Sequence, residues 1–197
     1  PKELEKRTGL KITIENDAKC FALAEAKLGA AKGKRHVLGV ILGTGVGCGI
    51  IIDGNIYRGA SGGAGEVGHT KRQKHDGLVE LEHMIAGPAL LMKHEQLSGQ
   101  KYESIKHIPR NDKHFQKVYS DFVKETGLFF SNLINLLNPE AIVVGGGLSN
   151  LDFYSEVRKI IAKTAIPELA KDCKILKNKL GDDAGVIGAA MLALHTT

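Results

Sequence analysis

The chain has 197 residues, 43% of them hydrophobic and 25% charged, a composition ordinary for one soluble α/β domain except for its 24 glycines. Its net charge of +5 comes from scattered lysines, so nucleic acid is not an expected partner, and the widely spaced Cys20, Cys48 and Cys173 exclude a disulfide framework. No apolar stretch approaches the roughly 20 residues that span a bilayer, so we expect a cytoplasmic protein without membrane contact.

The first part of the chain is expected to hold a short helix, a short strand and a second helix. Residues 1–8 have amphipathic spacing with Gly9 as a C′ residue, and residues 11–14 have the apolar character of a strand. Residues 18–31 have helical spacing, and Asp17 stands where an N-cap residue would.

A β-hairpin or meander with glycines inside its strands is predicted next. Residues 36–53 are an apolar run interrupted by Gly43-Thr44-Gly45-Val46-Gly47, and Gly54-Asn55 marks a turn before a returning strand. A glycine-rich loop follows at residues 61–68.

The second half alternates helices with strands. Asn138-Pro139-Glu140 ends the longest helix, and a buried strand then runs into Gly145-Gly146-Gly147. Helices are expected at residues 81–95, 115–137, 153–165 and 184–195, and strands at residues 141–144 and 173–176. Together these elements predict a mixed sheet with helices packed on it.

The first glycine run is a candidate phosphate site. Gly43, Thr44, Gly45 and Gly47 can present successive amide groups to phosphate oxygens, and Thr44 adds a hydroxyl donor. The run matches neither the P-loop nor the G-x-G-x-x-G pattern, and a tight hairpin or bulge would also account for it.

The second glycine run follows a buried strand. Gly145, Gly146 and Gly147 place backbone amides at the carboxyl end of a sheet, where α/β proteins bind ligands. A close turn from strand to helix is the simpler alternative. Two such runs in one chain favour a shared nucleotide.

Several polar residues are candidates for a second ligand. At a strand-to-helix junction, Asp17 can accept a proton from a substrate hydroxyl that Asn16 orients, although an N-cap alone would also explain it. Glu66, His69 and Glu82 suit hydrogen bonding to a polyol, but each would be unremarkable as an exposed residue.

In order and character, these motifs resemble the signature of the ROK family of sugar kinases. The resemblance rests on Glu15-Asn16-Asp17-Ala18, the run from Gly43 to Gly49, and Gly62-Gly63-Ala64-Gly65-Glu66-Val67-Gly68-His69. Asn138-Pro139-Glu140 before the second glycine run, and Gly181-Asp182-Asp183-Ala184-Gly185 before Gly188, extend it over the chain from Leu10 onward.

The resemblance implies an actin-like (ribonuclease H-like) fold and ATP-dependent phosphorylation of a hexose or N-acylhexosamine with Mg²⁺. Asp17 would be the general base, and Asn16, Glu66, His69 and Glu82 would hold the sugar. Residues 43–47 would face the ATP phosphates and residues 145–147 the adenosine. A homodimer is also expected.

Two departures from the family pattern change the expectation. The family's cysteine cluster, which binds zinc, has no counterpart in residues 71–80, so we expect no structural zinc and take His75 and His83 as surface histidines. The family's Asp-x-Gly-Gly-Thr phosphate motif is also absent. Residues 1–197 are therefore expected to be the carboxy-terminal lobe, inactive without an amino-terminal lobe.

Two other functions stay open. The family includes sugar-sensing transcriptional repressors, of which this chain would be the effector domain, and the loss of the cysteine cluster would also suit a non-catalytic sugar-binding lobe. The presence of both Asp17 and the Gly43–Gly47 run favours a kinase, because a sensor needs neither.

Overall fold

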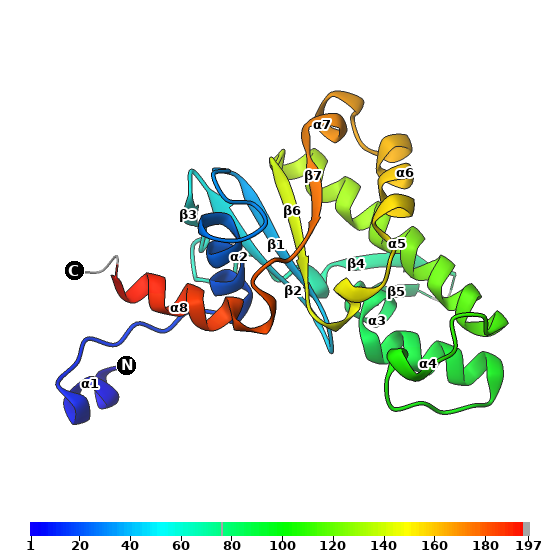
Figure 1. The fold of residues 1–197 in the computed structure, drawn as a ribbon, viewed down its shortest axis with the longest axis horizontal. Coiled ribbons are helices and arrows are strands. Elements are labelled where there is room, and N and C mark those ends of the chain that lie inside the picture. The colour runs from blue at the N-terminus through cyan, green and yellow to red at the C-terminus, as the bar shows by residue number, and fades with distance from the viewer. Residues whose placement is uncertain (76, 195–197) are drawn as a thin grey trace.

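The computed structural model describes residues 1–75 and 77–194 and has a five-stranded mixed sheet with helices on both faces (Figure 1). The strand order is β3-β2-β1-β6-β7, in which β1 pairs antiparallel with β2 and parallel with β6. The strands are β1 (Val37–Leu42), β2 (Val46–Ile52), β3 (Asn55–Ile56), β6 (Ala141–Gly145) and β7 (Lys174–Lys177). The predicted mixed sheet is thus confirmed, with β7 at an edge.

The helices form two layers around this sheet. α2 and α8 cover one face, whereas α3, α4, α5 and α6 lie on the other side (Figure 1). Their bounds are α1 (Lys2–Thr8), α2 (Asp17–Lys27), α3 (Glu82–Ile85), α4 (Gly87–Ser98), α5 (Lys113–Leu137), α6 (Tyr154–Thr164), α7 (Pro167–Asp172) and α8 (Ala184–Leu194). The predicted end of the last helix at His195 lies outside the described residues.

The central strands are buried on both faces, which explains their nearly continuous apolar sequence. In β6, Ile142 and Val144 face the core beneath α5, while Ala141 and Val143 face the core beneath α2. All four side chains are fully buried.

Helix α2 lies unusually close to the sheet because small residues meet at their contact. A Cβ atom at Gly39 would lie 2.6 Å from the Cβ of Ala22, and one at Gly49 would lie 2.2 Å from the carbonyl oxygen of Ala18. The glycines inside β1 and β2 are therefore explained largely by helix packing. This contact fixes the start of α2, where Asp17 lies, against the sheet.

The long helix α5 is the main support of the opposite face. Its N-cap, Asp112, accepts a hydrogen bond from the N–H of Phe115 through Oδ1 (2.7 Å), and Asn138 ends the helix in a left-handed conformation. Phe115, Phe122 and Phe130 are among the fully buried side chains of the protein.

Two predicted elements differ in the structure. Residues 11–14 belong to neither sheet of the described residues, and the N–H of Ile12 donates instead to Oε1 of Glu5 (3.0 Å). The helix predicted over residues 81–95 is divided into α3 and α4 at Ala86, whose backbone is extended. Pro88 begins α4 as a first-turn proline, a position where its missing N–H costs nothing.

Two short strands, residues 71–74 and 77–80, form a separate hairpin where the cysteine cluster is missing. β4 (Lys71–Lys74) and β5 (Gly77–Glu80) pair antiparallel, with Lys71 opposite Glu80 and Arg72 opposite Val79. The hairpin leads directly into α3, which carries Glu82.

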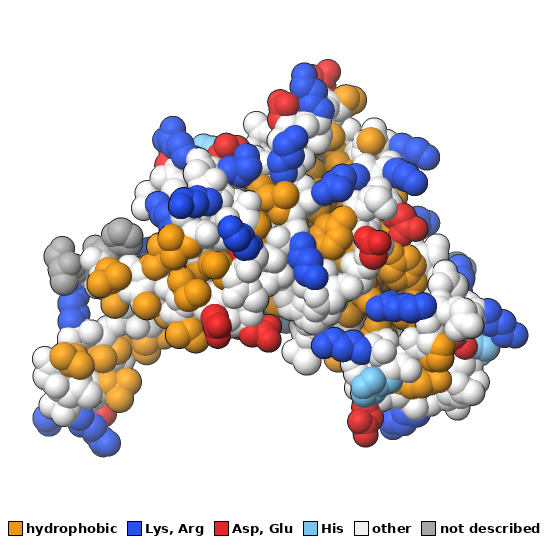
Figure 2. All heavy atoms as spheres, in the orientation of Figure 1, with side chains coloured by type: hydrophobic (Ala, Val, Ile, Leu, Met, Phe, Trp, Pro, Cys, Tyr) orange, Lys and Arg blue, Asp and Glu red, His pale blue; other side chains and the backbone are white. Residues whose placement is uncertain are grey.

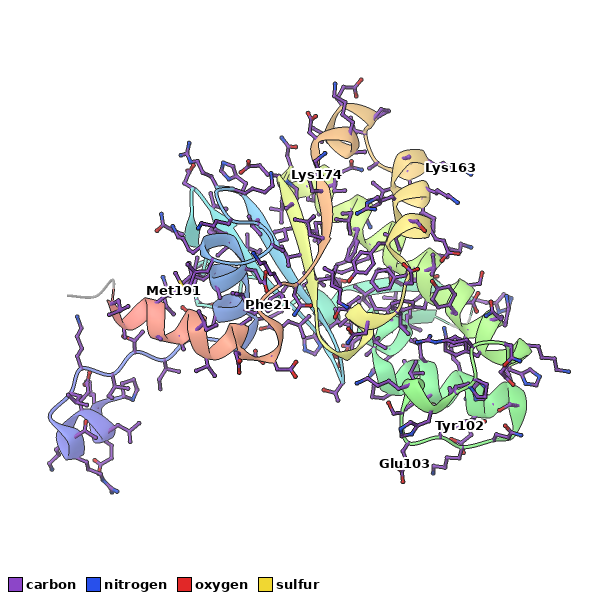
Figure 3. The ribbon with its side chains drawn as sticks, in the orientation of Figure 1. Phe21, Tyr102, Glu103, Lys163, Lys174 and Met191 are labelled. Carbon is purple, nitrogen blue, oxygen red and sulfur yellow. The ribbon has the colours of Figure 1, made fainter. Side chains whose placement is uncertain are left out.

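Apolar side chains remain exposed along α8 and α1 (Figure 2). In Figure 3, Met191 marks α8, and α1 stands apart from the sheet at the end of an extended segment. Val186 and Leu194 of α8 are each 74% exposed, and Leu10 and Ile14 of the extended segment are 66% and 67% exposed.

Candidate functional site

The turn between β1 and β2 is held by its own backbone and by the start of α4. The N–H of Gly43 donates to the carbonyl of Gly45 (3.0 Å), and the N–H of Gly87 donates to the carbonyl of Gly43 (2.8 Å). The extended backbone at Ala86, missed from the sequence, thus brings the N-terminus of α4 to this turn.

A cavity of about 360 Å³ opens beside this turn. The turn contributes Gly43 and Thr44 to its wall, and the segment after β6 contributes Gly147 and Leu148. The other lining residues come from α4 and from the segment between α4 and α5: Gly87, Pro88, Leu91, Glu103, Ser104, Ile105, Lys106 and Arg110, together with Asn150 and Leu151. Glu103 is labelled in Figure 3.

The donors of this cavity fit an anionic nucleotide. Gly43 and Gly147 have open space where a Cβ would be, so a ligand can approach their backbone closely. Lys106 and Arg110 add two positive charges, and Leu91 and Leu148 offer an apolar wall. This combination suits phosphates together with a flat apolar base.

The other glycines of the two runs have packing roles. A Cβ at Gly47 would lie 3.2 Å from that of Ala18, and one at Gly145 would lie 2.6 Å from the ring of Phe21, which is labelled in Figure 3. Gly146 has φ +80°, and a Cβ there would lie 2.4 Å from the carbonyl oxygen of Leu42. Gly45 lies against Glu82, with only 2.6 Å between its Cβ position and Oε2.

Asp17 lines a second, smaller cavity at the start of α2. Its Oδ1 accepts a hydrogen bond from the N–H of Ala18 (2.8 Å). The cavity, of about 230 Å³, is also lined by Gly146 and by the carboxylate-bearing Asp182. Gly146 lines this cavity and the next residue, Gly147, lines the first, so both cavities reach the turn that follows β6.

Asn16, rather than Asp17, is the N-cap of α2. Its Oδ1 accepts a hydrogen bond from the N–H of Lys19 (3.2 Å), so its side-chain amide group still has donors for a ligand. The sequence offered an N-cap role as the alternative explanation of Asp17. In the structure Asn16 has that role, so the cap does not explain the Asp17 carboxylate.

The loop before Glu66 is fixed to both α2 and β2. The buried side chain of Lys19 donates a hydrogen bond to the carbonyl of Gly62. Gly65 has φ +100°, and its Cβ position is 1.9 Å from the carbonyl oxygen of Cys48. Glu66 follows this contact directly and is exposed, although it lines neither of the two cavities.

Glu82 is hydrogen-bonded to the start of β2, the strand that the loop before Glu66 also contacts. Its Oε2 accepts a hydrogen bond from the N–H of Val46 (3.0 Å), the first residue of β2. A Cβ at Gly68 would lie 2.6 Å from the carbonyl oxygen of Val46. Residues 46–49 of β2 therefore contact all three segments: α2, the loop before Glu66, and α3.

His69 contacts Glu80, which lies next to Glu82 and so links His69 to the start of β2. Nδ1 of His69 lies 3.2 Å from Oε2 of Glu80. Carboxylate oxygens of Glu80 and Glu82 and a ring nitrogen of His83 all lie within 4.8 Å of one another. The structure thus brings His69 and Glu82 together, with Glu80 between them.

Sequence reasoning missed several residues of the site. The sequence indicates Asp182 only as part of a helix start and of the ROK resemblance, without a role of its own, and Lys106 and Arg110 belong to an irregular segment with no pattern that would single them out. Glu80 follows a polar stretch and had no recognisable role. A larger cavity of about 530 Å³, lined by α6, α7 and β7, lies away from both glycine runs.

Comparison with known proteins identifies the family. The ROK family model matches residues 1–196. The chain belongs to the ROK family.

ROK relatives share both its sequence and its fold. An N-acetyl-D-glucosamine kinase from Photobacterium profundum is 35% identical over 213 aligned residues, which cover 97% of this chain and 69% of that protein. The ROK hexokinase from Thermus thermophilus is 27% identical with a TM-score of 0.86, over 100% of this chain and 72% of that one. These matches confirm the predicted ROK membership and actin-like fold.

Two further ROK structures bear on function. A glucokinase from Streptomyces griseus, solved with glucose and AMPPNP, is 30% identical with a TM-score of 0.77, over 98% of this chain and 72% of that one. A transcriptional regulator, a homologue of the E. coli MLC protein, is 25% identical with a TM-score of 0.85, over 98% of this chain and 54% of that one. No described helix of this ROK chain has the length and apolarity needed to cross a membrane.

Proposed function

We propose that this chain is the carboxy-terminal lobe of a cytoplasmic ROK sugar kinase that transfers phosphate from ATP to a hydroxyl of a hexose or N-acylhexosamine. The names of its relatives support phosphorylation of a sugar. The observation that carries the proposal is the turn after β6, where Gly146 lines the cavity of Asp17 and the next residue, Gly147, lines the cavity suited to a nucleotide.

In this proposal, Asp17 is the general base. Its carboxylate accepts the proton of the sugar hydroxyl as that oxygen attacks the terminal phosphate, and the start of α2 holds it in place. Phosphoryl transfer depends mainly on positioning and on charge neutralisation, so few catalytic groups are needed.

The sugar is held by Asn16, Glu66, His69 and Glu82. Asn16 has side-chain N–H donors beyond its capping role, and Glu82 retains Oε1 for a hydroxyl while Oε2 accepts the N–H of Val46. Carboxylates and amides at fixed positions suit the several hydroxyls of a hexose.

The nucleotide occupies the cavity between the two glycine runs. Thr44 and Gly147 offer backbone donors, Gly43 leaves open space for a close approach, and Lys106 and Arg110 neutralise phosphate charge. Bound Mg²⁺ would supply further neutralisation, and the Asp182 carboxylate, which lines the cavity of Asp17, has the oxygen ligands that this ion prefers. Gly45, Gly47, Gly145 and Gly146 shape these loops through packing.

A sugar-dependent formation of ADP by the full-length protein is the direct test. We expect turnover with glucose or with an N-acylated hexosamine, and none without Mg²⁺ or without sugar. Sugar binding by calorimetry without any ADP formation would contradict the kinase proposal and would favour a non-catalytic sugar-binding lobe.

A sugar-sensing regulator is the second candidate, because the structure of an MLC homologue matches 98% of this chain. The discriminating measurement is binding to operator-length DNA by the full-length protein, with and without sugar. We expect no such binding from a kinase. We also propose a homodimer, which light scattering of the full-length protein would detect.

A further inference from the structure

The β4–β5 hairpin brings a glutamate to the side of His69. Lys71 and Glu80 lie directly opposite each other in the ladder, and the N–H of Leu81 donates to the carbonyl of Thr70 (2.9 Å). The position of Glu80 is therefore set by the register of the hairpin rather than by a flexible loop. His69 precedes β4 by two residues, so the two ends of the hairpin meet at this pair.

The contact between His69 and Glu80 has a defined polarity. An ionised carboxylate only accepts hydrogen bonds, so the 3.2 Å contact requires that Nδ1 of the imidazole carries the proton. In a neutral imidazole, Nε2 is then an acceptor with a free lone pair.

Glu80 is held ionised by its second partner. The ammonium group of Lys71 is hydrogen-bonded to Oε1, while His69 is bonded to Oε2. The pKa of Glu80 is lowered, chiefly by the hydrogen bond from Lys71 and next by that from His69. Lys71 also places a positive charge at this carboxylate, which disfavours a metal ion there.

The ring of His69 lies beside the proposed sugar site. Glu80 and Glu82 have carboxylate oxygens within 4.8 Å of each other, and Glu82 is fixed to the start of β2. The side chain of His69 is 62% exposed, so its ring remains open to a ligand.

We propose that Glu80 is a positioning residue for sugar binding, which holds His69 as the Nδ1–H tautomer so that Nε2 accepts a hydrogen bond from a sugar hydroxyl. The proposal rests on the proposed function, in which His69 contacts the sugar. The tautomer of His69 depends on the hydrogen bond to Glu80 and not on a bound sugar. The effect of Glu80 on this tautomer can therefore be measured without any substrate.

The first measurement is the tautomer itself. Long-range proton–nitrogen NMR of histidine side chains in the full-length protein, with His69 assigned from a His69→Gln variant, distinguishes a protonated from an unprotonated Nε2. We expect unprotonated Nε2 in the wild type and loss of this preference in Glu80→Ala. Glu80→Gln should retain it in part, because the amide oxygen can still accept from Nδ1.

The second measurement is sugar-dependent kinetics at saturating ATP. Glu80→Ala should raise KM for the sugar about 2- to 10-fold, the range that loss of one hydrogen bond produces, while kcat changes less than about threefold. Lys74→Ala is the matched control, because Lys74 belongs to the same hairpin but pairs with Glu125 (3.2 Å). It should leave both the tautomer and KM unchanged.

Each outcome has a distinct meaning. A wild-type His69 with protonated Nε2, an unchanged tautomer in Glu80→Ala, or an altered tautomer with unchanged KM would overturn the proposal. If Lys74→Ala changed the His69 tautomer and KM as much as Glu80→Ala does, the effect of Glu80 would be merely structural. This result would also overturn the proposal. A wild type with the expected tautomer but no sugar turnover would contradict the proposed function while supporting the tautomer assignment.

Discussion

At the scale of single residues, the candidate base can be tested with little change in shape. Asp17→Asn keeps a side-chain oxygen that can accept from the N–H of Ala18, so α2 should begin as before. Because the amide cannot accept the hydroxyl proton, kcat should fall at least about 100-fold, with sugar affinity within a few-fold. Steady-state kinetics and calorimetry of the full-length protein measure the two effects.

Asp183→Asn is the control for this change. It removes a carboxylate from the turn that bears Asp182, but Asp183 does not line the cavity of Asp17. An Asp17→Asn variant that turns over at the wild-type rate would remove Asp17 from the mechanism.

Gly65 offers a second test, because its backbone leaves no room for a methyl group. Gly65→Ala would place Cβ 1.9 Å from the carbonyl oxygen of Cys48, whereas Gly62 has a similar φ, +87°, with open space around it. Overpacking costs about 1–3 kcal/mol beyond the strain that both positions share, or about 2–12 °C in melting temperature at this size. Scanning calorimetry of both variants should show that Gly65→Ala is the less stable by this margin, and equal losses would contradict the close approach seen here.

At the scale of elements, the start of α5 has a pH-dependent contribution to stability. The pKa of Asp112 is lowered, chiefly by the N–H of Phe115 and also by His94, whose buried Nε2 lies 3.1 Å from Oδ1. A carboxyl group with a depressed folded-state pKa stabilises the fold above its unfolded pKa of about 4 and loses this effect as the pH falls through the folded value. Asp112→Ala should therefore lower the melting temperature at pH 7.

The expected size is about 2–4 °C, the shift for loss of one N-cap in a protein of this length. The difference between variant and wild type should shrink as the pH is lowered from the unfolded value of about 4 through the lower folded-state pKa of Asp112. A difference that stays constant down to pH 2 would show that the ionised carboxylate is not the stabilising species. Lys113→Ala, which leaves the cap in place, is the neighbouring control.

The β4–β5 hairpin leads to a prediction about metal. Cys20, Cys48 and Cys173 are all buried and unpaired, and none lies in the hairpin that follows His69. Burial raises the pKa of Cys48 to about 12 and that of Cys173 to about 11, which opposes the thiolate form that binds zinc. We therefore expect no tightly bound zinc.

Metal analysis of protein purified without a histidine tag checks this expectation. About one equivalent of zinc per chain that resists mild chelation would contradict it. In that case the donor atoms of Glu80, Glu82 and His83, which lie within 4.8 Å of one another, would be the first place to search.

At the scale of the whole molecule, the sequence predicted most of the fold because its patterns are local. The glycine runs, the helix spacing of α5 and the buried strand β6 lie where the residue pattern places them. The break at Ala86 was not predictable, since it depends on a contact with Gly43, far earlier in the chain.

The candidate site was only partly predictable for the same reason. Motifs pointed to Asp17 and to the glycine runs, but the division of those glycines between packing and ligand space depends on the positions of α2 and Phe21. Lys106, Arg110 and Asp182 reach their cavities through tertiary packing alone. The roles of all these residues in binding and catalysis remain predictions.

In the proposed function, the chain as a whole needs an amino-terminal lobe for activity. It spans 69% and 70% of the length of two N-acetyl-D-glucosamine kinases that it resembles. Val186 and Leu194 are strongly exposed apolar residues on α8, and we expect such a surface to contact another part of the full-length protein. Residues 1–197 alone should show less than about 1% of the full-length turnover, because a two-lobed kinase completes its site only when closed. Comparable turnover by residues 1–197 would show that one lobe suffices.

The strand order of the sheet also has a consequence for how the chain folds. Val37 in β1 pairs with Ile51 across a short hairpin, but its parallel partner is Ala141, about 100 positions later. The β1–β2 hairpin can therefore form early, while the other edge of β1 stays unpaired until the rest of the chain has been synthesised. An uncovered apolar strand edge is a site of aggregation. Expression of chains truncated before β6 should give insoluble protein, and the nucleotide cavity, which needs Gly147, should be among the last features to form.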